Sequence, residues 1–180
     1  QLGLTKDIEV QYGGENEDVQ KTFTEMFLAL LAGMAGMLAI LVLEFNSLRY
    51  SLYLLLTIPL SLIGVLFGLT ITGQFLSFSS MLGLIALAGV IINHAIILLD
   101  SILRKLEQDK SVVGASLSDV IVTSSAIRLR PIFLTTVTTV VGMLPLAFAS
   151  ALWGPLAFAI MFGLSFAMVL TLVLIPVFFY

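Results

Sequence analysis

The sequence predicts an all-α polytopic membrane protein: a bundle of five transmembrane helices, with a cytosolic amphipathic helix and a short extramembrane strand and helix at the N-terminus. The first observation is composition, because 59% of the 180 residues are hydrophobic and 11% are charged. The second is a mean hydropathy of +1.14. Ordinary globular chains are about 45–50% apolar and about 25% charged. A water-soluble domain of this size could not bury so much apolar surface.

The third observation is a series of apolar stretches, each near the ~20 residues that cross a bilayer. They cover residues 26–43, 51–72, 78–99, 131–150 and 155–179. Three of the four connections are so short that they allow only antiparallel neighbours. We therefore expect residues 26–180 to form one transmembrane domain. Within the second stretch, Gly64 and Gly68 form a GxxxG pair, which is typical of close helix packing.

The N-terminal segment, residues 1–25, is the only clearly hydrophilic part of the chain. Apolar and polar residues alternate in it, which suits a short strand: Ile8, Val10 and Tyr12. A helix should follow and run directly into the first span. The strand has no partner in the sequence, the first residue is Gln1, and Tyr180 directly follows an apolar run. We therefore expect the sequence to be a piece of a longer protein.

The long connection, residues 100–130, holds most of the remaining charge. Several of its apolar residues fall on one helical face, which predicts an amphipathic helix at the membrane surface: Val113, Leu117, Val120 and Ile121. The next span should begin at Pro131, because proline suits the first turn of a helix.

The distribution of lysine and arginine predicts the orientation. Arg49 lies in the first short turn, and the long connection contains Arg104, Lys105, Lys110, Arg128 and Arg130. The turns expected on the other side of the membrane, residues 73–77 and 151–154, carry no charge. The long connection and the C-terminus should therefore be cytosolic, and the N-terminal segment should lie outside.

Several function classes are excluded by residue content. The chain has no cysteine and one histidine, so disulfides, thiolate metal sites and cysteine nucleophiles are absent. No serine nucleophile elbow, no metal-ligand spacing and no basic patch with interleaved aromatics is found. We expect no catalytic residue, no cofactor, no metal site and no nucleic-acid partner.

Two polar residues inside the third span, Asn93 and His94, are the first candidates for function. Polar side chains are expensive in lipid and often mark proton or ion pathways, and histidine titrates near neutral pH. Gly89, Asn93 and Asp100 share a stripe that should face other helices. The alternative is that both side chains only form interhelical hydrogen bonds, worth roughly 0.6 kcal/mol on average. The spacing leaves both interpretations open.

Hydroxyl groups gather in the fourth span, where Thr135 shares a helical face with Thr138 and Thr139. Hydroxyls one turn apart could line a wet path. Threonine can also bond the carbonyl four residues before it, and the spacing favours this simpler interpretation. Arg128 lies at the expected cytosolic end of the same helix, where it could serve only to orient the protein in the membrane.

The order of four segments resembles the C-terminal half of a resistance-nodulation-division (RND) transporter. These segments are EFNSLRYSLYLLLTIPLSLIG, GLIALAGVIINHAIILLD, RLRPIFLTTVTTVVGMLPLA and LIPVFFY. The resemblance is greatest to the hydrophobe/amphiphile efflux branch, the multidrug pumps of bacterial inner membranes. It implies that the five stretches are spans eight to twelve of a twelve-span protein, and that residues 1–25 are the end of a periplasmic porter region.

The resemblance also implies a mechanism and partners. Such proteins work as homotrimers, exchange protons for drugs or other amphiphiles, and often join a periplasmic adaptor and an outer-membrane channel. Their relay uses acids in the N-terminal half, with partners on spans ten and eleven. Asn93 occupies a position where many members have lysine, and Arg128 and Thr135 match the family pattern. We expect Asn93 to be the relay contact and His94, turned about 100° around the helix, to be a titrating neighbour.

Asp100, Thr138 and Thr139 are secondary relay candidates. Two other functions remain open. One is a member of the same superfamily that exports lipids or assists protein export. The other is a membrane scaffold that transports nothing and uses its polar residues to hold helices together.

Overall fold

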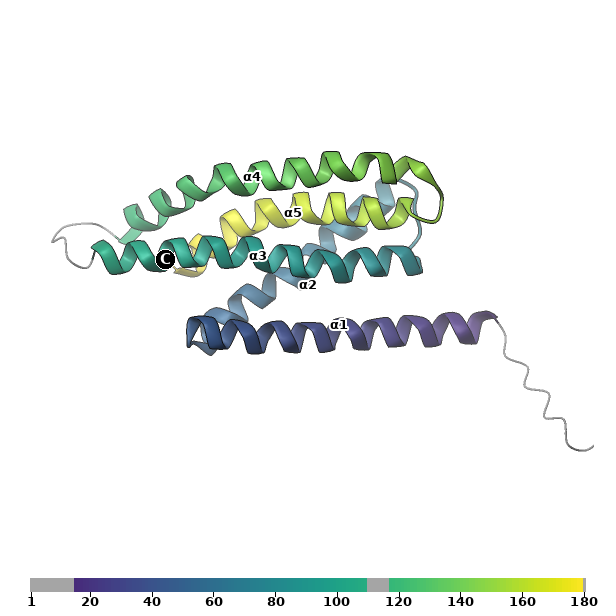
Figure 1. Cartoon of the computed structure of the whole chain (residues 1–180), viewed down its shortest axis with the longest axis horizontal. Coiled ribbons are helices and arrows are strands. Elements are labelled where there is room, and N and C mark those ends of the chain that lie inside the picture. The colour runs from purple at the N-terminus through teal and green to yellow at the C-terminus, as the bar shows by residue number, and fades with distance from the viewer. Residues whose placement is uncertain (1–14, 110–116, 180) are drawn as a thin grey trace, which may run out of the picture.

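The computed structural model describes residues 15–109 and 117–179. Figure 1 shows the helices in chain order: α1 (Glu15–Phe45), α2 (Leu48–Ile71), α3 (Phe78–Asp109), α4 (Leu117–Ala149) and α5 (Gly154–Phe179). Each of these five helices contains a segment long and apolar enough to cross a membrane. The predicted all-α polytopic membrane fold is therefore confirmed. The strand predicted over residues 8–12 lies outside the described residues.

The connection between the third and fourth spans differs from the prediction. α3 continues to Asp109 and α4 already begins at Leu117. The described part of the connection therefore extends two membrane helices and does not form a separate surface helix. Pro131 accordingly lies inside α4, and the prediction that it begins the helix was wrong. Pro131 is exposed, so its ring meets few packed neighbours, and one lost backbone hydrogen bond does not end the helix.

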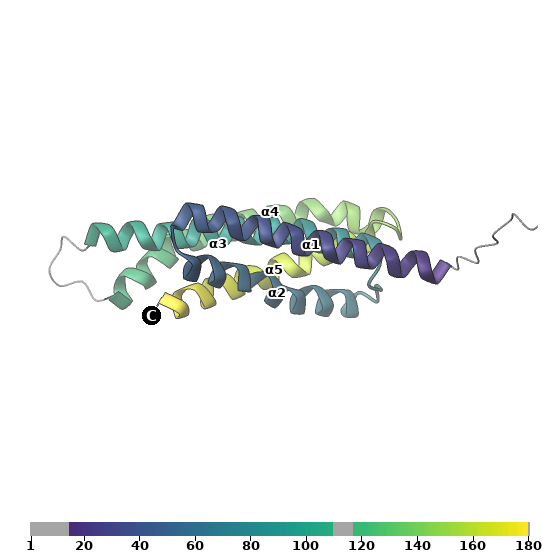
Figure 2. The ribbon, with the colours of Figure 1, turned by 90° about the horizontal axis from the view of Figure 1, so that it is seen from below.

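α5 forms the centre of the bundle. It contacts α2, α3 and α4, and Figures 1 and 2 show it enclosed by these three helices while α1 lies to one side. Close approach is possible because the buried face of α5 carries small residues: Ala157, Ala159, Gly163 and Ala167. α1 contacts only α2 and α3 among the described helices. The packed framework that positions α3 against α4 is therefore built on α5.

The GxxxG pair of α2 packs against two phenylalanines of α5. Gly68 lies against Phe162, and Gly64 lies one turn earlier against Phe166. A side chain at either glycine would collide with the base of a phenylalanine. The close helix packing predicted from these glycines is therefore confirmed.

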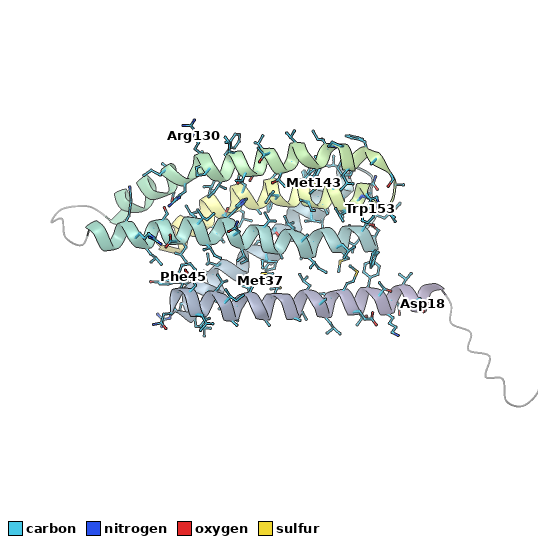
Figure 3. The ribbon with its side chains drawn as sticks, viewed as in Figure 1. Asp18, Met37, Phe45, Arg130, Met143 and Trp153 are labelled. Atoms are coloured by element: carbon cyan, nitrogen blue, oxygen red, sulfur yellow. The ribbon has the colours of Figure 1, made fainter. Side chains whose placement is uncertain are left out.

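The two ends of the bundle differ in charge. Figure 3 shows Asp18 and Trp153 at one end, and Phe45 and Arg130 at the other. The arginine-bearing end of α4 thus lies opposite the uncharged α4–α5 turn. This arrangement agrees with alternating antiparallel spans, and the orientation in the membrane stays a prediction from the positions of lysine and arginine.

Candidate functional site

The candidate site begins with one contact between α3 and α4. His94 of α3 and Thr135 of α4 approach each other so that Nε2 of the imidazole lies 3.2 Å from Oγ1 of the threonine. His94 is buried, with 6% of its surface exposed, whereas the preceding Asn93 is exposed. On the same turn of α3, the His94 side chain therefore points into the bundle and the Asn93 side chain lies at its surface.

These residues line a groove of about 250 Å³ between the two helices. Polar and apolar side chains both contribute to its wall: Val90, Asn93, His94, Ile97, Pro131, Ile132, Thr135 and Thr139. Pro131 and the apolar members were not predicted as part of the site. None of the lining residues is an acid, lysine or arginine, so its hydrogen-bonding capacity comes from one amide, one imidazole and two hydroxyls.

The Thr135 hydroxyl has more neighbours than it can donate to. Its Oγ1 lies 2.9 Å from the Ile132 carbonyl oxygen, 3.1 Å from the Pro131 carbonyl oxygen and 3.2 Å from His94 Nε2. A hydroxyl has one hydrogen to donate and two lone pairs that accept. When Thr135 donates to a carbonyl, His94 must donate its Nε2 proton to Thr135. Which ring nitrogen carries the proton therefore sets the direction of this contact.

The other hydroxyls of α4 have simpler roles. Thr138 donates to backbone carbonyls of Leu134 and Thr135, and Thr139 donates to the Thr135 carbonyl. This is the backbone bonding that the spacing favoured. Thr139 is half-buried and lines the groove, whereas Thr138 is exposed and does not belong to its wall. Of the three hydroxyls that could line a path, Thr135 and Thr139 belong to the groove wall.

The two charged candidates lie apart from the groove wall. Asp100 accepts from the Arg104 guanidinium at 2.8 Å in an ion pair along one face of α3. Arg128 is half-buried and lies two turns before Thr135 on α4. Within residues 15–109 and 117–179, no group of three or more His, Asp or Glu side chains is arranged to hold a metal ion.

Thr136 is a polar residue that sequence reasoning missed. Its hydroxyl is buried, and Oγ1 has no hydrogen-bond partner among the described residues. The sequence places Thr136 in the same run of hydroxyls as its neighbours. Nothing in the sequence indicates that it alone points into the bundle, because this depends on how α4 rotates against α3 and α5.

Comparisons with known proteins cover the whole chain. Residues 1–180 match a family model described as the AcrB/AcrD/AcrF family. The swarming motility protein SwrC of Bacillus subtilis (strain 168) is 28% identical over 176 residues, covering 95% of this chain and 16% of SwrC.

Two solved structures, both described as a heavy metal efflux pump, are also similar. One is 29% identical with a TM-score of 0.79 and the other 30% identical with a TM-score of 0.77. The matched regions cover 97% and 99% of this chain, but only 18% and 17% of the pump chains. The chain thus spans less than a fifth of the length of the proteins it matches.

Proposed function

The chain belongs to the AcrB/AcrD/AcrF family of RND transporters, and on that premise we propose that it supplies half of the transmembrane bundle of a proton-driven efflux pump. In this proposal the five helices are spans eight to twelve. Residues 1–25 then lie in the periplasm, and the α3–α4 connection and the C-terminus lie in the cytosol of a bacterial inner membrane.

The observation that carries the proposal is the polar groove between α3 and α4. Three of its polar side chains, Asn93, His94 and Thr135, line it in the part of each helix that is apolar enough to lie in lipid. Intramembrane polar residues that converge on a cavity are expensive and commonly belong to proton or ion pathways. An open groove next to a titratable imidazole supports proton movement better than it supports a purely structural role.

The missing components of the relay are proposed to come from the N-terminal half of the same protein. That half would contribute acids, and it would cover the exposed side of Asn93. Asn93 carries no charge, so it would contact these acids by hydrogen bonding in place of the family's frequent lysine. Arg128 would stand at the cytosolic end of the proton route.

The exported substrate is proposed to be an amphiphilic small molecule such as a drug or detergent. The working unit would be a homotrimer that joins a periplasmic adaptor and an outer-membrane channel and is embedded in membrane lipid. Lipid export, assistance of protein export and a non-transporting scaffold are not favoured, because the solved neighbours are efflux pumps.

Metal-ion export is the second candidate function. Both solved neighbours are described as heavy metal efflux pumps, and this description favours an ionic cargo as the alternative to amphiphiles. The two candidates share the same proton-driven bundle and differ in what the periplasmic region would bind.

Transport by the complete protein in liposomes tests these proposals. Proton flux under an imposed pH gradient should increase when an amphiphilic dye is present on the side of the membrane from which the transporter exports it. An increase with Zn²⁺ or Cu⁺ in place of the dye would favour metal cargo. Absence of flux under all conditions would contradict the proposed antiporter.

A further inference from the structure

The strongest unexplained feature outside the groove wall is the buried hydroxyl of Thr136. It is 3% exposed, and Oγ1 has no hydrogen-bond partner among the described residues. A buried polar group without a partner is unfavourable, because it has lost its hydrogen bonds to water without gaining others. The acceptor one turn before it is the Ile132 carbonyl, the usual partner of a helical threonine hydroxyl.

That carbonyl is already fully used. It accepts the backbone N–H of Thr136 as part of the α-helix, and it accepts the Thr135 hydroxyl at 2.9 Å. A carbonyl oxygen has two lone pairs, so no capacity is left for the Thr136 hydroxyl. Two neighbouring hydroxyls therefore compete for this acceptor. Thr135 occupies it because the Ile132 oxygen lies nearer to Thr135 Oγ1, at 2.9 Å, than the Pro131 oxygen does, at 3.1 Å.

His94 can decide this competition. When Nε2 carries the ring proton, it donates to Thr135, whose hydroxyl then donates to the carbonyl. When Nε2 carries no proton and Nδ1 does, Nε2 is an acceptor, and the Thr135 hydroxyl can turn to it. The Ile132 carbonyl is then open to Thr136. In this exchange Nε2 releases one proton to the groove and Nδ1 takes up one, so the charge of the ring does not change.

We infer that His94 is a positioning residue that directs the Thr135 hydroxyl, and that Thr136 takes over the Ile132 carbonyl when Thr135 turns toward the imidazole. Both arrangements contain two hydrogen bonds among these side chains. In the first, Thr136 has no partner, and in the second every hydroxyl has one. Through this exchange, the position of the proton on the His94 ring determines whether the Thr136 hydroxyl inside the bundle is hydrogen-bonded. Only its role in transport rests on the proposed function.

High-resolution electron microscopy of the complete transporter tests the exchange directly. Thr135→Val removes the competing hydroxyl, and the Thr136 side chain should rotate to bring Oγ1 within hydrogen-bond distance of the Ile132 carbonyl. Thr139→Val is the matched control, because Thr139 bonds the carbonyl of Thr135, and it should leave Thr136 unchanged. A Thr136 rotamer that stays the same in Thr135→Val, or a wild-type Thr136 hydroxyl bonded to an acceptor other than the Ile132 carbonyl, would overturn the inference.

Proton flux through two His94 variants tests the positioning role. The side-chain amide nitrogen of glutamine reaches the position of Nε2 in histidine. The amide nitrogen of asparagine reaches only the position of Nδ1. His94→Gln should therefore retain about fivefold to tenfold more flux than His94→Asn, the effect of one ordinary hydrogen bond. Equal flux in the two variants would contradict the role assigned to Nε2. A wild type without proton flux would contradict the proposed function, while the Thr136 rotamer would still decide the exchange.

Discussion

Gly64 of α2 lies directly against Phe166 of α5: a methyl carbon added to the glycine would lie 2.7 Å from Cγ of the phenylalanine. It would lie nearer still to Cβ, which is fixed to the α5 backbone and cannot rotate away. The two helices can therefore keep their separation only while this position has no side chain. Since α5 also supports α3 and α4, the contact helps to set the geometry of the groove.

Gly64→Ala should destabilise the protein. Overpacking of a tight interface destabilises by about 1–3 kcal/mol, which outweighs the gain in helix propensity of up to about 1 kcal/mol for alanine over glycine. The measurement is the temperature at which the detergent-solubilised transporter loses its monodisperse elution peak. Gly36→Ala is the matched control, because no atom of another helix lies within 4 Å of the Cβ added there. Equal midpoints for the two variants would show that α2 and α5 are not in close contact.

Pro131→Ala distinguishes the observed helix from the one that the sequence predicted. Inside α4, alanine restores a backbone N–H that can bond the Ile127 carbonyl. Since an interior proline destabilises a helix by about 3 kcal/mol, the thermal midpoint should rise. A proline in the first turn would give little change, because its N–H has no partner there. An unchanged midpoint would thus favour a helix that begins at Pro131.

The contrast at Pro131 shows which parts of the fold can be predicted from sequence. The spans can be predicted because length and apolarity are sufficient to identify them. The helical extensions past the apolar stretches cannot be identified in this way. Residues 100–109 of α3 are rich in charge, so no apolar pattern distinguishes a helix that continues from a loop.

The candidate site was predictable in its residues and not in its contacts. Asn93, His94 and Thr135 stand out because polar groups are rare in apolar spans. Which of them touch depends on the rotation of α3 and α4 about their axes, and the core around α5 sets this rotation. That Asn93 is the relay contact stays a prediction. In the structure it is His94 that bonds Thr135.

Asp100→Asn should have little effect on stability or proton flux. The Asp100 and Arg104 side chains are 40% and 73% exposed in their ion pair, and exposed pairs of this kind contribute about 0.2–1 kcal/mol. Asp100 also does not line the groove. Thermal midpoint and liposome proton flux measure the two effects. A large loss of flux with an unchanged midpoint would instead place Asp100 on the proton route.

Alanine at Asn93 and at His94 should separate transport from stability. Asn93 is exposed between α3 and α4 and is proposed to contact the acids of the N-terminal half by hydrogen bonding, so Asn93→Ala should lower the thermal midpoint little while reducing proton flux about fivefold to tenfold, the effect of one hydrogen bond. His94 is buried and bonded to Thr135. His94→Ala should therefore lower the midpoint as well, because a large-to-small substitution in a core lowers the free energy of unfolding by roughly 2 kcal/mol or more.

Both quantities must be measured on the same preparation of the complete transporter, because a loss of flux has no meaning for a protein that has unfolded. A midpoint for Asn93→Ala as low as that of His94→Ala would show that Asn93 serves mainly stability. Normal flux in His94→Ala, after correction for the folded fraction, would remove His94 from the relay. Its contact with Thr135 would then be an interhelical hydrogen bond alone, the alternative that the spacing of the third span leaves open.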